Sequence, residues 1–328
     1  MANMTPSRIG SANSAAGSDN YKDLFFKVFT GEVLTYFEQA TAVLDKHTVR
    51  TISSGKSAAF ALTGVTTAAY HTPGTQLTGD SIKHNEKVIT IDGLLLAQSS
   101  IANIDEAMNH YDVRAIYAKE QGIALANAFD KNVLQEALLG ARASNLITGG
   151  NAGTVITSAN SKLTTGAGNT IGTQGSATTL ALQAAALRDA IFAAATSLDQ
   201  KNAPKTRYCV LRPAEFYALF QDTTIINSLY GNGGNLATGA LPQIAGINIL
   251  VSNNLPGTDL SGNTFHGVNA ATTAAVIFCP EAVGTVKLMD LAVESEYLID
   301  YQSTLLVSKY AMGHSWLRPE ACVEVKCA

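Results

Sequence analysis

Charged residues are scarce in this chain. Only 15% of its 328 residues are Asp, Glu, Lys or Arg, whereas ordinary soluble domains contain about 25%. The formal net charge is −4 and no run of like charge occurs, so the sequence does not predict a protein that grips a nucleic-acid backbone. The shortage of charge also indicates that much of the surface is buried against another molecule.

Cysteine and long apolar runs are scarce as well. The four cysteines include no CxxC pair and are too few for a disulfide framework, so we expect buried thiols. No apolar run reaches about 18 residues, and no charged segment followed by an apolar one marks a signal peptide. We therefore expect no membrane span, no conventional secretion, and synthesis in a cytosol.

Short motifs that resemble chemical sites all depart from their patterns. Ser54–Ser57 reads SGKS, but Arg50 stands where a phosphate loop needs Gly, and no helix is predicted to follow. Gly313–Leu317 reads GHSWL, which resembles a nucleophile elbow but ends in Leu instead of Gly. The six histidines form no HExxH motif. We expect no catalytic residue, cofactor or metal site, and a serine hydrolase built on Ser315 remains as the enzyme alternative.

The longest periodic stretch runs from Asn103 to Arg142. Apolar residues recur along it at helical spacing, Asn103 is a suitable N-cap, and the cation of Arg142 suits a helix C-terminus. Tyr111 and Asp112 are candidates for a break, and the part from Asp112 onward would span roughly 45 Å as a helix. Two interpretations stay open: a buried core helix, and a spine that carries two separate lobes.

The N-terminal residues predict a tail followed by a helix. Residues 1–20 are mostly small and polar, with little apolar surface to bury. Tyr21–Ala40 has helical spacing with aromatic residues on one side, among them Phe25 and Phe29. This aromatic face would dock either on another surface or on the chain's own core.

A long hairpin or extended loop is predicted before the spine. Val49–Leu62 and Lys87–Ile101 are rich in β-branched and small residues, and the segment between them contains a proline and several glycines. Two such arms would reach roughly 60 Å. A compact chain of this length has a radius of gyration of only about 20 Å. An isolated ribbon is marginal in water, so we expect this one to lie across a neighbouring copy.

The second half of the chain predicts an α/β lobe and a return to strands. Residues 143–175 are dense in Gly, Thr, Asn and Ser and predict a loop or insertion. Helices from Ser176 to before Pro204 and from Pro213 to Phe220 alternate with short apolar strands, giving a lobe at roughly 175–280. From 285 onward the pattern predicts strands to the C-terminus.

Several runs of this sequence resemble the major capsid protein of short-tailed phages of the T-seven type. They occur in the family's order and cover both ends of the chain. The runs are FFKVFTGEVLTYF at Phe25, VRTISSGKSAAF at Val49, IKHNEKVITIDGLL at Ile82, EAMNHYDVR at Glu106, AVGTVKLMDLAVE at Ala282 and KYAMGHSWLRPEA at Lys309.

The resemblance implies an α+β fold, an HK-97-like capsid fold. Its parts would be an N-terminal arm, an extended loop that overlies the adjacent subunit, a peripheral domain with a spine helix, and an α/β axial domain. The implied ranges are 1–47 for the arm, 48–101 for the extended loop, 102–142 for the spine helix, 143–282 for the axial domain and 283–328 for the peripheral and C-terminal strands. The residues expected at subunit contacts are Arg50, Lys56, Lys83 and Lys87 in the loop, and Phe25 and Phe29 in the arm.

The resemblance also implies function and partners. We expect hexamers and pentamers of this chain in an icosahedral virion shell, assembled in the host bacterial cytoplasm. The partners would be a scaffold protein, a portal (connector) protein and packaged double-stranded DNA bound without sequence specificity; no cofactor and no membrane are expected. An encapsulin-like nanocompartment shell is the alternative with the same fold.

Overall fold

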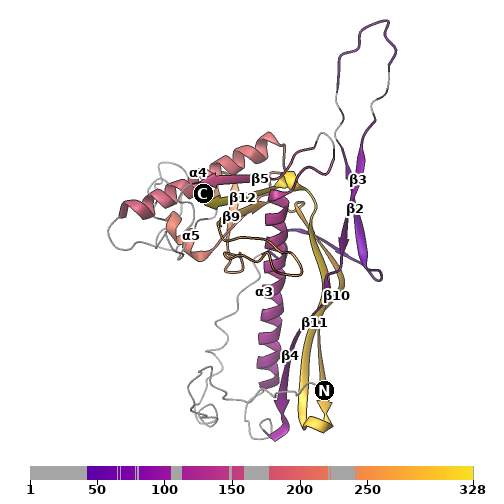
Figure 1. The fold of residues 1–328 in the computed structure, drawn as a ribbon, viewed down its shortest axis with the longest axis vertical. Coiled ribbons are helices and arrows are strands. Elements are labelled where there is room, and N and C mark those ends of the chain that lie inside the picture. Colours follow the sequence, from indigo (N-terminus) through magenta and orange to yellow (C-terminus); the bar gives the residue numbers. More distant parts are fainter. Residues whose placement is uncertain are drawn as a thin grey trace. The chain divides into compact units, whose positions relative to one another are not determined.

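The chain is described here from a computed structural model (Figure 1). The residues it describes are 43–104 without 65, 67, 78 and 80, then 113–158 without 148 and 149, then 177–220, 222, 241 and 243–327. They form two compact units. The first unit contains Gly93–Phe129 and Met289–Met312, and the second contains Ala42–Asp92, Asp130–Leu288 and Gly313–Ala328.

Helix α3 (Val113–Arg142) contributes residues to both units. It confirms the helix that periodicity predicted, over 30 residues and ending at Arg142. Residues 133–138 are buried on every side, so this part is a core helix of the second unit. The predicted break at Tyr111 and Asp112 lies outside the described residues.

A long antiparallel pair of strands forms the sheet of the first unit. Strand β4 (Gly93–Ala102) pairs with the part of β11 (Ser303–Trp316) between Ser303 and Met312, and β10 (Val283–Leu298) follows β11 in the sheet order. The short 3-10 helix η3 (Ile299–Tyr301) lies between β10 and β11 in the chain. On α3, Gln121 donates to the Ser99 hydroxyl and accepts a hydrogen bond from Ser308. The helix therefore covers one face of this sheet.

The second unit is built around a six-stranded mixed sheet of order β5-β12-β9-β6-β8-β7. Strand β9 is buried at all six positions and lies between β12 and β6. Helix α4 (Ala177–Gln200) contacts β5, β12 and helix α5 (Pro213–Leu219). The strands are β5 (Thr154–Ser158), β6 (Tyr208–Leu211), β7 (Gln243–Ile244), β8 (Ile247–Val251), β9 (Thr273–Phe278) and β12 (Cys322–Cys327).

Most elements of the predicted α/β lobe are confirmed. The apolar stripe of α4 is buried from Ala184 to Leu198, and α5 begins at Pro213 as a first-turn proline predicts. The prediction of a loop throughout 143–175 is wrong at β5, whose short TVITS run is hidden among Gly, Asn and Thr. This strand forms because β12, far along the chain, pairs with it in parallel. The short 3-10 helix η4 (Pro319–Ala321) precedes β12.

The predicted hairpin is present but narrower than the sequence suggested. Strand β2 (Ser57–Thr63) pairs antiparallel with β3 (His84–Thr90). Strand β1 (Thr48–Thr51) instead pairs in parallel with β10, and β4 pairs with β11. The outer parts of both predicted arms thus belong to a four-stranded sheet of order β1-β10-β11-β4.

Some predictions concern residues that the structure does not describe. The tail, the helix at Tyr21–Ala40 and most of the Gly-rich stretch after β5 lie outside the described residues. No helix among the described residues is both long and apolar enough to cross a membrane. Cys209, Cys279 and Cys322 are buried free thiols as expected, whereas Cys327 is only half-buried.

Candidate assembly surface

The loop that joins β2 to β3 is open to solvent throughout its described part. Every described residue from Thr66 to Lys83 is exposed, and Figure 1 shows the loop continuing well past the paired strands. Tyr70 is 105% exposed and Leu77 79% exposed. A Cβ placed on Gly74 or Gly79 would meet no atom within 4 Å. The hairpin loop, defined as residues 64–83, therefore presents apolar side chains that its own chain leaves uncovered.

At the other end, the hairpin is anchored in a small core of the second unit. Ala58 of β2 and Ile89 of β3 are buried with Val286 and Leu317. Gly313 of β11 passes so close to the carbonyl of Thr90 that a Cβ there would collide with it. The root of the hairpin is consequently rigid, while its loop is exposed.

The six residues predicted at subunit contacts have different surroundings. Phe25 and Phe29 lie outside the described residues. Arg50 donates to the carbonyl of Ala59 at 3.0 Å and lies 5.7 Å from the ring centroid of Phe60, so it supports its own hairpin. Lys56 and Lys83 are exposed at the two ends of the hairpin strands.

Lys87, the last of these residues, contacts its own chain. Its ammonium lies 3.7 Å from the ring centroid of Trp316, a cation–π contact. Burial lowers the pKa of Lys87, and the nearby carboxylate of Glu136 partly opposes that shift. This contact gives Lys87 a role inside the subunit, at the root of the hairpin.

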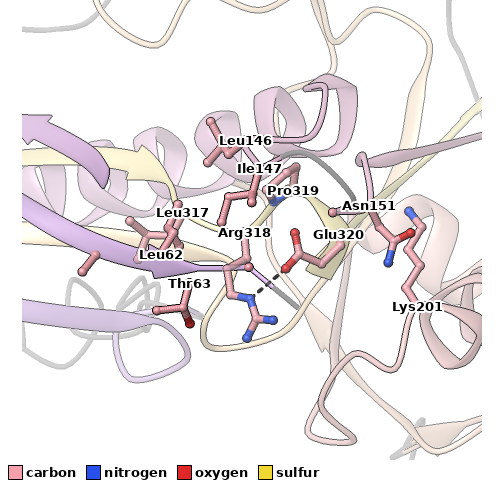
Figure 2. Close-up of a pocket in the computed structure, with 13 residues that line it drawn as sticks. Leu62, Thr63, Leu146, Ile147, Asn151, Lys201, Leu317, Arg318, Pro319 and Glu320 are labelled. Atoms are coloured by element: carbon pink, nitrogen blue, oxygen red, sulfur yellow. Dashed lines mark hydrogen bonds and ion pairs between the residues drawn. The ribbon is translucent and has the colours of Figure 1, made fainter. Parts of the chain in front are cut away.

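Beside the loop-side end of strand β2 is a pocket of about 320 Å³ (Figure 2). Leu62, Ile147 and Leu317 contribute apolar surface, and Lys201 and Arg318 contribute cations. Both cations are already engaged. Lys201 donates to Ala152 and Thr154, and Figure 2 shows the guanidinium of Arg318 turned toward Glu320. With no free cation at its wall, the pocket is poorly suited to a small anionic ligand.

A buried charged cluster lies at the hairpin root, next to the end of β3. His266 places its Nε2 at 2.8 Å from Asp92 Oδ2 and its Nδ1 at 2.7 Å from Glu136 Oε1. The other oxygen of Glu136 accepts the backbone N–H of Trp316 at 3.0 Å. The ring of His314 meets that of His266 edge-on at 5.6 Å. This cluster is not recognisable in the sequence, because its members are up to 174 positions apart and share no motif.

The motifs set aside in the sequence have structural roles. Ser57 begins strand β2, so no helix N-terminus follows the SGKS run to bind a phosphate. Ser315 lies within β11, where the backbone is a continuous strand and not a nucleophile elbow. Within the described ranges, no three His, Cys, Asp or Glu side chains are arranged to hold a metal ion.

Comparison with known proteins identifies the family. The model of the family described as "Gp10A-like: Major capsid protein" matches residues 59–326. The major capsid protein of Escherichia phage T7 is 35% identical, over 98% of this chain and 97% of that protein. The chain belongs to this major capsid protein family.

Solved structures agree with the assignment. The capsid of cyanophage P-SCSP1u is 43% identical, covers 100% of this chain and 99% of its own, and superposes with a TM-score of 0.78. The mature capsid of bacteriophage PhiM1 is 20% identical with a TM-score of 0.73 over 97% of both chains, which supports the fold alone. This protein is a tailed-phage major capsid protein with an α+β, HK-97-like fold, and its family is structural, not enzymatic. Neither the nanocompartment nor the hydrolase alternative is favoured.

Proposed function

We propose that this capsid protein assembles as hexamers and pentamers into the icosahedral shell that encloses the double-stranded DNA of a tailed phage. Assembly takes place in the host bacterial cytoplasm, with a scaffold protein and a portal protein as partners. The proposed organisation is an arm at 1–47, an extended loop at 48–101, a spine helix at 102–142, an axial domain at 143–282 and peripheral strands at 283–328.

The exposed hairpin loop is the observation that carries this proposal. A subunit that stayed alone in water would expose Tyr70, Leu77 and Ile82 on a narrow two-stranded ribbon, an arrangement with little stability of its own. Apolar surface of this kind marks a protein–protein contact. The hairpin therefore lies on a neighbouring subunit, where these side chains are buried. Lys56 and Lys83 flank it as charges available to that neighbour, and Phe25 and Phe29 provide an aromatic face for the arm.

Shortening the hairpin loop tests the proposal. The pair closed by the hydrogen bond from Gly64 N to Lys83 O at 2.8 Å would be kept, and residues 66–81 would be replaced by Asn-Gly, a favoured two-residue hairpin turn. The variant would be co-expressed with the scaffold protein. We expect a folded subunit with the circular dichroism and thermal transition of the wild type, but no closed shells by electron microscopy.

A matched pair of loop variants serves as the control. Tyr70→Ser with Leu77→Ser removes apolar surface, whereas Thr72→Ser with Thr75→Ser changes the same loop without removing any large apolar side chain. Shells should be lost with the first pair and kept with the second. Closed shells from the shortened chain would show that the hairpin is not an assembly contact.

The net charge of the chain supports weak, sequence-independent binding to the packaged DNA. The chain carries a formal net charge of −4, so a shell of it offers no concentrated positive surface to phosphates. This allows DNA to slide during packaging and release. Fluorescence anisotropy of duplex DNA with purified subunits should show weak binding; tight binding that falls steeply with salt would contradict this part of the proposal.

A further inference from the structure

The cluster around His266 has a geometry that suits a charged imidazole. Both ring nitrogens face carboxylate oxygens, at 2.8 Å for Asp92 and 2.7 Å for Glu136. A neutral imidazole donates at one nitrogen only, whereas imidazolium donates at both. Burial lowers the pKa of His266, but the two carboxylate hydrogen bonds outweigh it and raise the pKa to about 9. At neutral pH the ring is therefore a cation between two anions, with its side chain only 4% exposed.

The loop that carries His266 is a preformed support. His266 itself has a left-handed backbone, with φ of 53°, which non-glycine residues adopt only when their surroundings hold them there. Backbone hydrogen bonds from Leu260 to Val268 and from Ala270 to Thr258 close the loop on itself. A Cβ on Gly267 would come within 2.9 Å of the Ser261 carbonyl, so the loop is also closely packed. The imidazole is thus presented from a fixed position.

Asp92 connects the fixed imidazole to both strands of the hairpin. It lies two residues after the end of β3. Its neighbour Ile91 donates a backbone hydrogen bond of 2.9 Å to the carbonyl of Lys56, immediately before β2. The carboxylate of Asp92, which His266 contacts, therefore lies at the root of the hairpin, next to the hydrogen bond that joins the two strands there.

Glu136 provides the fixed point on the other side of the ring. It projects from the buried part of α3 and accepts the Trp316 backbone N–H with its second oxygen. Lys87 of β3 lies over the Trp316 ring and interacts electrostatically with Glu136. The hairpin root is therefore tied to α3 twice, through Asp92 and through Lys87.

The remaining neighbours are buried and coupled to the same ring. His314 of β11 packs edge-on against His266. Its Nδ1 lies 2.9 Å from the Thr285 hydroxyl, which also lies 2.8 Å from His47 Nε2. The charges of Lys287 and Asp45 act on His47. The titratable and charged groups of this region are Asp92, Glu136, Lys87, His314, His47, Lys287 and Asp45.

We propose that His266 is a positioning residue for assembly: its imidazolium joins Asp92 to Glu136 and thereby fixes the direction in which the β2–β3 hairpin leaves the second unit. This inference rests on the proposed contact between the hairpin and a neighbouring subunit. An ion cluster that only stabilised the subunit would leave the hairpin equally ordered when the charge is lost. A positioning charge predicts that the hairpin loosens while the rest of the unit stays intact.

The single tryptophan of the chain makes the test direct. Trp316 fluorescence of the full-length subunit would be followed from pH 7 to pH 10.5 in wild type, His266→Gln and Lys87→Met. We expect a step near pH 9 in wild type, its loss in His266→Gln, and its retention in Lys87→Met, which excludes lysine titration as the cause. An unchanged step in His266→Gln would overturn the assignment of the charge to His266.

Hydrogen exchange then separates positioning from stability. In His266→Gln at pH 7.5 we expect amides of β2 and β3 to exchange at least tenfold faster, with β9 and α4 unchanged. His84→Gln, an exposed histidine of β3, is the matched control and should exchange like wild type. Asp92→Asn repeats the test should His266→Gln fail to fold. Unchanged exchange in the hairpin of the folded variant would overturn the proposal.

Assembly with scaffold distinguishes this inference from the proposed function. We expect His266→Gln to give at least tenfold fewer shells while the folded subunit remains soluble. Wild-type yields from a variant with a loosened hairpin would overturn the positioning role and leave the shell function standing. Shells from the loop-shortened chain would instead overturn the hairpin contact itself, whatever the fluorescence of Trp316 shows.

Discussion

Arg142 and Glu324 form a two-point ion pair within the second unit. Nε of Arg142 donates to Oε2 of Glu324 and Nη2 donates to Oε1, each at 2.6 Å. The Glu324 side chain is fully buried, whereas that of Arg142 is 32% exposed. The hydroxyl of Thr273 adds a third hydrogen bond to Glu324 at 2.7 Å. The last residue of α3 is thereby fixed to strands β12 and β9.

Removing Arg142 should destabilise the second unit strongly. Arg142→Gln leaves the buried carboxylate of Glu324 without its cation, and loss of one partner of a buried pair costs about 3–5 kcal/mol. Arg318→Gln is the control, because Arg318 is 42% exposed and its partners Glu281 and Glu320 are 55% and 21% exposed, and such solvent-exposed pairs contribute about 0–1 kcal/mol. Urea unfolding of the two variants measures the difference. Equal losses of unfolding free energy would contradict the assignment of a buried pair.

Gly313 should tolerate no side chain. A Cβ there would collide with the carbonyl of Thr90 at the hairpin root, and the nearest atoms all belong to the backbone of Thr90 and Ile91. We expect Gly313→Ala to lower the unfolding free energy by about 1–3 kcal/mol. Gly262→Ala, whose Cβ would meet no atom within 4 Å, should leave it nearly unchanged. A melting temperature for Gly313→Ala equal to that of wild type would show that this approach is not tight.

Two lysines of the hairpin should respond differently to the same substitution. Lys87→Met removes a cation–π contact with Trp316 that is partly shielded from water, and we expect the subunit to lose about 1 kcal/mol of unfolding free energy. Lys83 is exposed, so Lys83→Met should change the yield of shells without changing subunit stability. Thermal unfolding and electron microscopy of both variants check this. A stability loss in Lys83→Met alone would reverse the two assignments.

Much of the fold was predictable because its signals are local. The apolar stripes of α3 and α4, the first-turn proline of α5 and the turn residues between β2 and β3 each lie within one short stretch. Apart from the pairing of β2 with β3, strand partners were not predictable, because they depend on distant segments. Strand β5 has little apolar character, and only its pairing with β12 identifies it as part of a sheet.

The candidate contact residues show the same difference between local signals, which the sequence contains, and contacts with distant segments, which it does not reveal. For the lysines, the position in or beside the hairpin was predictable from the sequence, but the surroundings were not. A lysine that faces solvent and a lysine over Trp316 look alike in sequence, so Lys83 and Lys87 were grouped together. The His266 cluster was missed for a related reason: Asp92, Glu136 and His266 occur in three unrelated stretches, and only the folded chain brings them together.

Subunit stability should be greatest near about pH 6.5 and should decline from there toward about pH 9. His266 has a raised pKa, so its contribution is complete below about pH 6.5 and disappears as the pH rises through about 9. The full contribution amounts to at most about 3 kcal/mol. On the acid side, burial and the nearby charges of His266 and His47 lower the pKa of His314, and burial lowers that of His47. These lowered pKa values disfavour protonation of both rings in the native state, so stability is lost as the pH falls below about 6.5.

The losses of unfolding free energy at alkaline and at acid pH are caused by different histidines. Urea unfolding at intervals from pH 5 to pH 10 should show both losses in wild type. His266→Gln should lose the alkaline decline, because no imidazolium remains to deprotonate. It should keep an acid decline, since protonation of His47 and of buried His314 still costs free energy. Unfolding free energy that rises steadily through pH 10 would show that His266 is not charged in the native state.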